Sequence, residues 1–97
     1  APERQALYHA AAVFASNFPI VLAAVAERLL REAGVAREEA RPAVRHLLSS
    51  AAANLARGDE AALALTGPVV RGDEPTVRRH LDALDASPAL SDVAFLY

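Results

Sequence analysis

The first third of the chain is predicted to form one long helix. Over residues 3–33 the apolar side chains show no strand-like alternation, and Pro19 is the only helix-breaking residue. We expect this helix to kink or restart near residues 17–19. It should end at Gly34, because a glycine followed by an apolar residue, here Val35, is a common helix stop. The longest predicted element is therefore the first.

The next helix is predicted to run from Arg37 to about Arg57, where Gly58 closes it. Its apolar positions repeat at helical spacing and should face a core. These positions are Ala40, Ala43, Val44, Leu47, Leu48, Ala51 and Leu55. A short turn or helix is predicted over residues 59–65, followed by a loop over residues 66–73 that is rich in turn residues.

Two more helical segments are predicted near the end of the sequence. Asp73 is a favourable N-cap for a helix that runs to about Asp85, with Pro75 in its first turn. Ser87 is expected to cap a last segment that begins at Pro88. The chain is thus predicted to be a single all-α domain over residues 1–97, with about five helices around the long first one.

The first predicted helix is unusual because it is apolar on every side. Between residues 10 and 26 its only polar side chains are Ser16 and Asn17. Such a helix needs cover all round, either from the other helices or from a second subunit. A membrane span is the third option, but this alanine-rich stretch is interrupted by polar residues and Pro19. It therefore falls short of the about 20 strongly apolar residues that a span needs. We expect a homodimer through this helix and no membrane, because 97 residues can scarcely cover it.

Composition excludes several classes of function. The net charge of −2 argues against a nucleic-acid partner, since such domains carry a basic excess. The sequence has no cysteine, which rules out disulfides and thiolate metal sites and agrees with a cytoplasmic location. The three histidines lack metal-ligand spacing, so no metal site is expected. The four glycines form neither a Gly-x-Gly-x-x-Gly pattern nor a P-loop, so the chain has no dinucleotide fold of its own.

Two groups of residues are candidates for chemistry. Helical geometry places His9, Ser16 and Asn17 within one sector of the first helix, where they would form one wall of a polar cleft. The alternative is structural: Ser16 bonds back to the carbonyl four residues earlier, and Asn17 eases the break before the proline. In the loop over residues 66–73, Thr66 and Arg71 are candidates for binding a carboxylate or phosphate near a helix start. There the alternative is a tight turn.

Residues 7–17 and 65–77 resemble a known family. Both stretches are similar to the C-terminal helical domain of Rossmann-like proteins that carry domain of unknown function 2520. The resemblance implies an N-terminal Rossmann domain that binds NADP, in a plan similar to 6-phosphogluconate dehydrogenase, ketopantoate reductase and pyrroline-carboxylate reductase. In such proteins the helical domain closes the substrate cleft and usually forms the dimer.

The same resemblance implies roles for individual residues. Several relatives place a lysine and an asparagine on the long first helix, facing the nicotinamide; this chain has no lysine and carries His9 and Asn17 instead. His9 is then expected to be the proton donor or acceptor and Asn17 to hold the substrate oxygen, while Ser16, Thr66 and Arg71 are expected to contact substrate. The chain by itself is expected to be inactive. The alternative is a stand-alone helical module that only self-associates.

Overall fold

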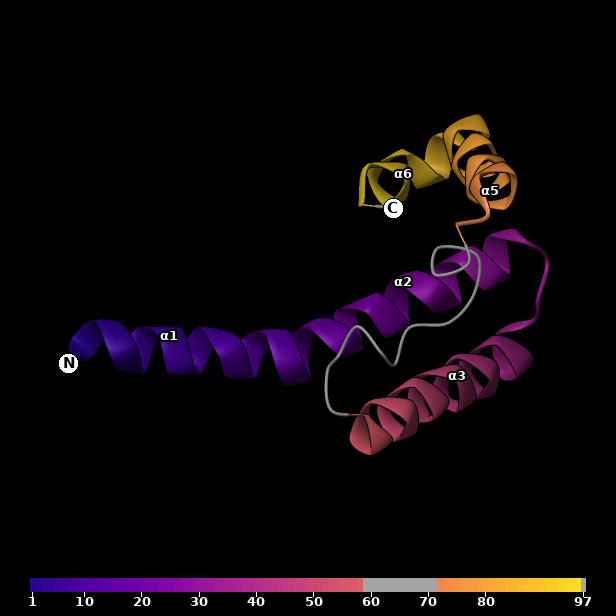
Figure 1. The fold of residues 1–97 in the computed structure, drawn as a ribbon. Helices are drawn as coiled ribbons and strands as arrows, with labels where there is room; N and C mark the ends of the chain where they lie inside the picture. The colour runs from indigo at the N-terminus through magenta and orange to yellow at the C-terminus, as the bar shows by residue number, and fades with distance from the viewer. Residues whose placement is uncertain (59–71, 97) are drawn as a thin grey trace. The chain divides into compact units, whose positions relative to one another are not determined.

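The computed structural model describes residues 1–58 and 72–96, and every element in those residues is helical (Figure 1). The all-α prediction is therefore confirmed for this part of the chain. The turn or helix predicted over residues 59–65 lies outside the described residues. The elements are α1 (Pro2–Ala12), η1 (Val13–Asn17), α2 (Phe18–Glu32), α3 (Arg37–Arg57), α5 (Glu74–Ala86), η3 (Pro88–Leu90) and α6 (Ser91–Leu96). They form two compact units, Ala1–Ser50 and Ala51–Tyr97.

The first unit begins with the predicted long helix. α1, η1 and α2 follow one another without a break, so that the helix is continuous over Pro2–Glu32. It ends at Gly34, whose φ of 95° lies in the left-handed region that favours glycine. The Gly34 N–H donates to the Arg31 carbonyl at 3.0 Å and the Val35 N–H donates to the Leu30 carbonyl at 2.9 Å. This pair of bonds is the Schellman motif, which confirms the predicted stop.

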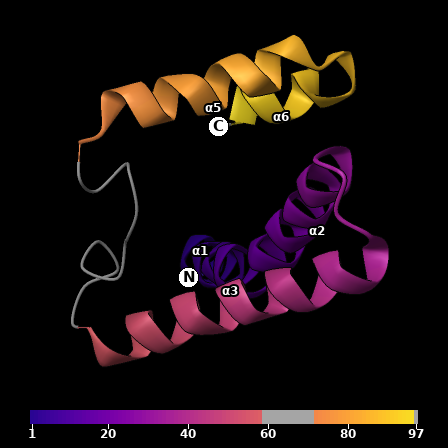
Figure 2. The same cartoon turned by 90° about the vertical axis from the view of Figure 1, so that its right-hand side faces the viewer.

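α2 packs on the N-terminal half of α3 (Figure 2). Ala40 and Val44 are 1% and 4% exposed, and the guanidinium of Arg41 lies 3.5 Å from the Glu27 carboxylate. Because both charged side chains are partly exposed, this ion pair contributes at most about 1 kcal/mol. Between the two helices runs an apolar groove of about 410 Å³, which we call the α2/α3 groove. It is lined by Pro19, Leu22, Ala23, Ala26, Val44, Leu47 and Leu48.

The predicted core stripe of α3 is buried only at its beginning. Leu47 is 65% exposed, and Leu48 and Leu55 are also exposed. The prediction that the whole stripe faces a core was therefore wrong for these leucines and for Ala43 and Ala51, which are also exposed. The physical reason is that the residues of α3 that line the groove with α2 end at Leu48. Helical periodicity shows which side of a helix is apolar, but not how much of that side finds a partner.

The long first helix is only partly covered by the described parts of its own chain. No residue of α1, η1 or α2 is buried in the described part of the chain, and half-buried side chains occur only in α2, from Pro19 onward. By length and composition, Pro2–Glu32 is long and apolar enough to cross a membrane, with a mean hydropathy of 1.7. The expectation that this helix is too short to span a membrane was based on residues 10–26 alone. The helix in the structure is longer than that stretch. Core helices of soluble proteins and signal sequences have the same properties, so this helix alone does not place the chain in a bilayer.

The second unit contains α5, η3 and α6, which form a helical hairpin with its own small apolar core (Figure 2). Leu84, Leu90 and Val93 are 8%, 6% and 4% exposed. Both helices were predicted close to their observed bounds. Ser87 precedes the last segment as predicted, but its side chain makes no cap hydrogen bond. The Ser87 carbonyl instead accepts the Leu90 N–H at 3.0 Å and so begins a 3-10 turn.

Asp73 is confirmed as the N-cap of α5. Its Oδ1 accepts the Thr76 N–H at 3.2 Å and its Oδ2 accepts the Thr76 hydroxyl at 2.7 Å. The Thr76 hydroxyl hydrogen bond, followed by the backbone one, lowers the pKa of Asp73 below its ordinary value of 3.8. A lowered pKa means that the ionised carboxylate stabilises the fold.

Asp73→Ala is expected to lower the thermal midpoint of the chain by a few degrees and to fray α5, because the first turn loses its cap. The stabilisation by Asp73 should be complete well above its ordinary pKa of 3.8 and fade as the pH falls through the lowered pKa, since only the carboxylate accepts both bonds. Thermal melts by circular dichroism between pH 2 and pH 6 measure both effects. Asp82→Ala, an exposed acid in the same helix, is the control. An equal loss in both variants would contradict the cap.

Candidate functional site

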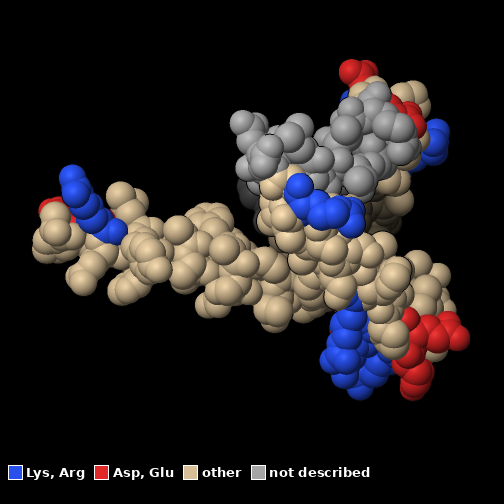
Figure 3. Space-filling view, turned by 60° about the horizontal axis from the view of Figure 1, so that its bottom comes forward, with Lys and Arg blue, Asp and Glu red and all other residues tan. Residues whose placement is uncertain are grey.

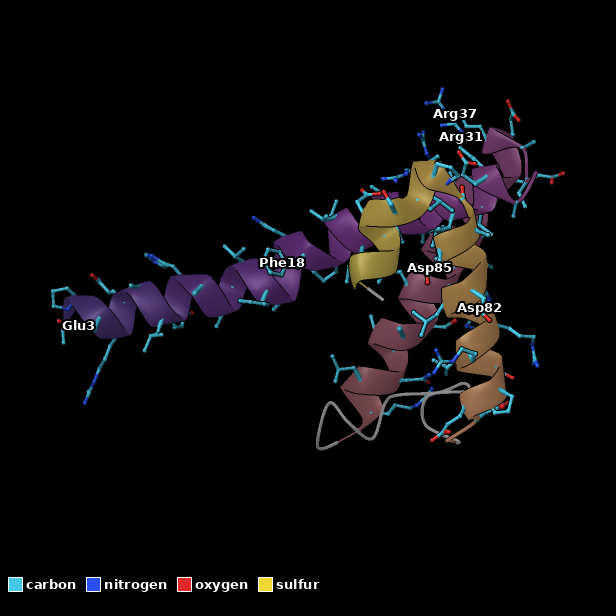
Figure 4. The ribbon with its side chains drawn as sticks, turned by 90° about the horizontal axis from the view of Figure 1, so that it is seen from above. Glu3, Phe18, Arg31, Arg37, Asp82 and Asp85 are labelled. Atoms are coloured by element: carbon cyan, nitrogen blue, oxygen red, sulfur yellow. The ribbon has the colours of Figure 1, made fainter. Side chains whose placement is uncertain are left out.

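The candidate residues of the first helix lie at a π-helical turn. Val13–Asn17 is a π-helix, in which the Phe18 N–H donates to the Val13 carbonyl five residues earlier (Figure 4). Pro19 is the cause, because it has no N–H for the Ala15 carbonyl and its ring would clash with that carbonyl in a regular α-helix. One wider turn relieves the clash. π-turns are rare and are found often at functional sites.

The Ser16 hydroxyl stabilises this turn from the side. Its Oγ lies 2.6 Å from the Ala12 carbonyl and 3.1 Å from Asn17 Oδ1. A hydroxyl has one hydrogen, and the shorter of the two contacts shows that Ser16 donates it to the Ala12 carbonyl. This is the bond to the carbonyl four residues earlier that the structural alternative predicted. Rotating the Asn17 amide by a half turn lets its NH₂ donate to Ser16 Oγ. Asn17 then keeps its carbonyl oxygen for another partner.

The π-turn brings Asn17 into line with His9. In a regular α-helix two residues eight positions apart lie about 80° apart around the axis. One extra residue in the wide turn rotates all later residues back by about 100°, which leaves Asn17 within about 20° of His9. Along the axis the two residues remain ~12 Å apart. They therefore share one face of the helix. Because of this separation they could contact the two ends of a ligand, but they could not both contact one reacting atom.

This face of the helix points away from α3. The α2 residues in the α2/α3 groove, Pro19, Leu22, Ala23 and Ala26, lie on average about 190° around the axis from Asn17. His9 and Asn17 are both exposed, and the Tyr8 and His9 rings meet edge to face at a centroid distance of 6.2 Å. The structure thus places His9 and Asn17 on one open surface. A closed cleft over them requires a surface from outside this unit.

The second predicted group lies mostly outside the described residues. Thr66 and Arg71 belong to the part of the chain that the structure does not describe. Gly72, the next residue, has a φ of 68°, which lies in the left-handed region that favours glycine. A hollow of about 610 Å³ follows, lined by Gly72, Asp73, Glu74, Pro75, Val77, Arg78 and Leu81. Asp73 is engaged as the cap of α5.

Neither of these two hollows is lined by His9, Ser16 or Asn17. Within the described residues, no group of three or more histidine or acidic side chains is placed to hold a metal ion. The described glycines with positive φ, Gly34 and Gly72, lie at a helix stop and at a turn before α5. The candidate site is therefore a surface that contributes side chains to a cleft.

Sequence reasoning missed the π-turn. It predicted a kink or restart near residues 17–19, whereas the helix continues and widens one turn earlier. The signal was present, because a proline inside an uninterrupted apolar helix, preceded by a serine able to bond backwards, is the pattern that such a turn accommodates.

Comparison with known proteins gives one match. The model of the family described as Domain of unknown function (DUF2520) matches residues 1–96. No curated protein and no solved structure matches the chain.

Proposed function

The chain belongs to the DUF2520 family, and we propose that it is the helical, substrate-closing and dimerising domain of an NADP-dependent oxidoreductase. A Rossmann domain N-terminal to it is proposed to bind the cofactor, in the plan of 6-phosphogluconate dehydrogenase. The observation that carries the proposal is the π-turn, which aligns His9 and Asn17 on a face of the helix that its own unit leaves open. The substrate is not assigned.

In this proposal the Rossmann domain supplies the other wall of the cleft. An imidazole and an amide on an exposed face become useful for acid–base work only when a second surface excludes water from them. His9 is proposed as the proton donor or acceptor, and the free oxygen of Asn17 or its NH₂ group as a partner of the substrate. Because they are ~12 Å apart, they would contact different ends of it. Ser16, Thr66 and Arg71 are proposed as further substrate contacts, and the compartment is proposed to be the cytoplasm.

The second candidate function is a helical module that only self-associates. It is favoured by the exposure of large apolar side chains along the first helix and by the fact that the Ser16 hydroxyl is already bonded to the helix. Both proposals include a homodimer. They differ in whether the polar face has a chemical role.

The test uses the parent polypeptide that contains this domain. NADPH binding is measured by fluorescence titration, and NADPH oxidation at 340 nm is measured against a panel of 2-oxo acids and imines. His9→Ala is expected to lower kcat by about 10² to 10⁴ without changing NADPH binding, because a positioned acid or base contributes that much. His46→Ala is the matched control, since His46 is an exposed histidine on α3.

Each outcome separates the proposals. A parent protein that does not bind NADPH would overturn the oxidoreductase assignment. Turnover that is unchanged in His9→Ala and in Asn17→Ala would remove the polar face from catalysis and favour the self-association module. Circular dichroism of each variant shows that the helices are retained.

A further inference from the structure

We propose that Ser16 is a positioning residue that turns the carbonyl oxygen of Asn17 outward, where it accepts a hydrogen bond from a neutral donor on the ligand, such as a hydroxyl group. This inference rests on the function proposed above for the face that carries His9 and Asn17. It adds which atom of Asn17 meets the ligand and which chemistry the ligand offers there. The substrate contact proposed for Ser16 is then made through Asn17.

The Ser16 hydroxyl has a fixed direction. Its Oγ lies 2.6 Å from the Ala12 carbonyl oxygen, which carries no hydrogen, so the hydroxyl donates its single hydrogen to that oxygen. The hydroxyl oxygen still has a lone pair for another bond, but it has no second hydrogen to donate. Toward its other neighbours Ser16 is therefore only an acceptor.

This acceptor decides which end of the Asn17 amide faces it. Ser16 Oγ and Asn17 Oδ1 are placed 3.1 Å apart, which is a hydrogen-bond distance. Two acceptor oxygens with no hydrogen between them repel each other, whereas an NH₂ group in the same place donates to Oγ. A half turn of the amide exchanges its oxygen and nitrogen and occupies the same space. The Asn17 oxygen then points away from Ser16.

The outward oxygen is left for a partner from outside the helix. Asn17 is exposed, and within the described residues its side chain bonds only to Ser16. Residues 5–26 contain no Asp, Glu or Arg, and Figure 3 shows the stretch beyond the N-terminal charges without blue or red side chains. The helix thus gives a ligand ammonium group no counter-charge near Asn17. A neutral donor, such as a hydroxyl, fits this oxygen best.

Holding the amide still has a use in binding. A ligand that binds a freely turning side chain must first order it, and this ordering weakens the binding. The bond to Ser16 orders Asn17 before the ligand arrives. Because one hydrogen bond shifts an equilibrium by roughly two- to tenfold, loss of the Ser16 hydroxyl should weaken the ligand contact by that factor.

NMR of the 97-residue chain tests the orientation directly. Its only side-chain amides are Gln5, Asn17 and Asn54, so each NH₂ signal can be assigned. We expect nuclear Overhauser contacts between the Asn17 NH₂ protons and the Ser16 β-protons. Three-bond couplings across the first side-chain torsion of Asn17 should show one rotamer in the wild type and in Ser16→Thr, which keeps the hydroxyl, and averaging in Ser16→Ala. Asn54, which accepts from the Arg57 guanidinium, is the control and should not change.

The NMR results can overturn the proposal without any substrate. A single Asn17 rotamer whose NH₂ protons show no contact to Ser16 would mean that the oxygen faces the hydroxyl. Equal averaging in the wild type and in Ser16→Ala would mean that Ser16 does not hold the amide.

Turnover of the parent polypeptide tests the consequence. With the most reactive member of the panel of 2-oxo acids and imines, kcat/KM is expected to fall roughly two- to tenfold in Ser16→Ala and to recover in Ser16→Thr. Asn17→Asp, which accepts but does not donate, should retain more turnover than Asn17→Ala. The reverse order would show that the ligand accepts from the NH₂ group, and unchanged kcat/KM in Ser16→Ala would remove the positioning role; either result overturns the proposal. A parent protein that does not bind NADPH would overturn the oxidoreductase assignment, whereas the NMR result on Ser16 and Asn17 stands by itself.

Discussion

Val44→Asp is expected to disrupt the packing of α2 on α3 and to lower the free energy of unfolding by about 3 kcal/mol or more. Val44 is 4% exposed and lines the α2/α3 groove together with Leu22 and Ala23. An aspartate in that position loses its water, so that the chain either keeps a buried charge or takes up a proton. A domain of 97 residues has a small margin of stability, and this loss is a large part of it.

Urea unfolding followed by circular dichroism measures the change. Ala43→Asp is the control, because Ala43 precedes Val44 on the same helix but is exposed. It introduces the same charge and the same low helix propensity, which cost about 0.5 kcal/mol. Equal destabilisation by both variants would show that the effect comes from helix propensity and that Val44 is not a packing residue.

The helix bounds were largely predictable from the sequence because they depend on local chemistry. Gly34 stops α2 through its positive φ, and Asp73 begins α5 through hydrogen bonds to Thr76. Both effects act within one turn of the chain, so the residue types alone point to them. The bounds of α3, Arg37–Arg57, agree with the prediction for the same reason.

Burial was harder to predict than the bounds, because it depends on partners. The apolar pattern marks Leu47 and Val44 alike, yet one is 65% and the other 4% exposed. Likewise, a helix that is apolar on all sides was expected to need cover, but the pattern does not say which surface provides it. Within the described residues, α3 partly covers α2, and no residue of the long helix is buried.

The candidate site was predicted only in part. His9 and Asn17 were assigned to a sector of about 80° from regular α-helical geometry. The structure narrows this angle through the π-turn that Pro19 causes, which a fixed 100° per residue does not anticipate. Whether the two residues act in chemistry remains a prediction, since their cleft needs a surface from outside the unit.

Phe14→Glu is expected to raise the dissociation constant of the proposed dimer by about a thousandfold. Phe14 is 66% exposed in the single chain, so its replacement leaves the fold of the monomer intact. In the homodimer proposed above to form through the first helix, both copies contribute a Phe14 ring, and losing a well-packed aromatic side chain costs about 2 kcal/mol at an interface. Two such losses give the expected factor. A glutamate in this contact would also lose its water.

Analytical ultracentrifugation over a range of concentrations measures this shift. Val21→Glu is the matched control, because Val21 is 58% exposed and lies on the side of the helix that carries Asn17, away from the groove. We expect it to change the dissociation constant less than about tenfold, as rim charges usually do. A dimer that survives Phe14→Glu but dissociates in Val21→Glu would place the contact on the His9 and Asn17 face. That face would then be buried between two copies and closed to a substrate cleft, so the measurement bears on the proposed function as well as on the dimer.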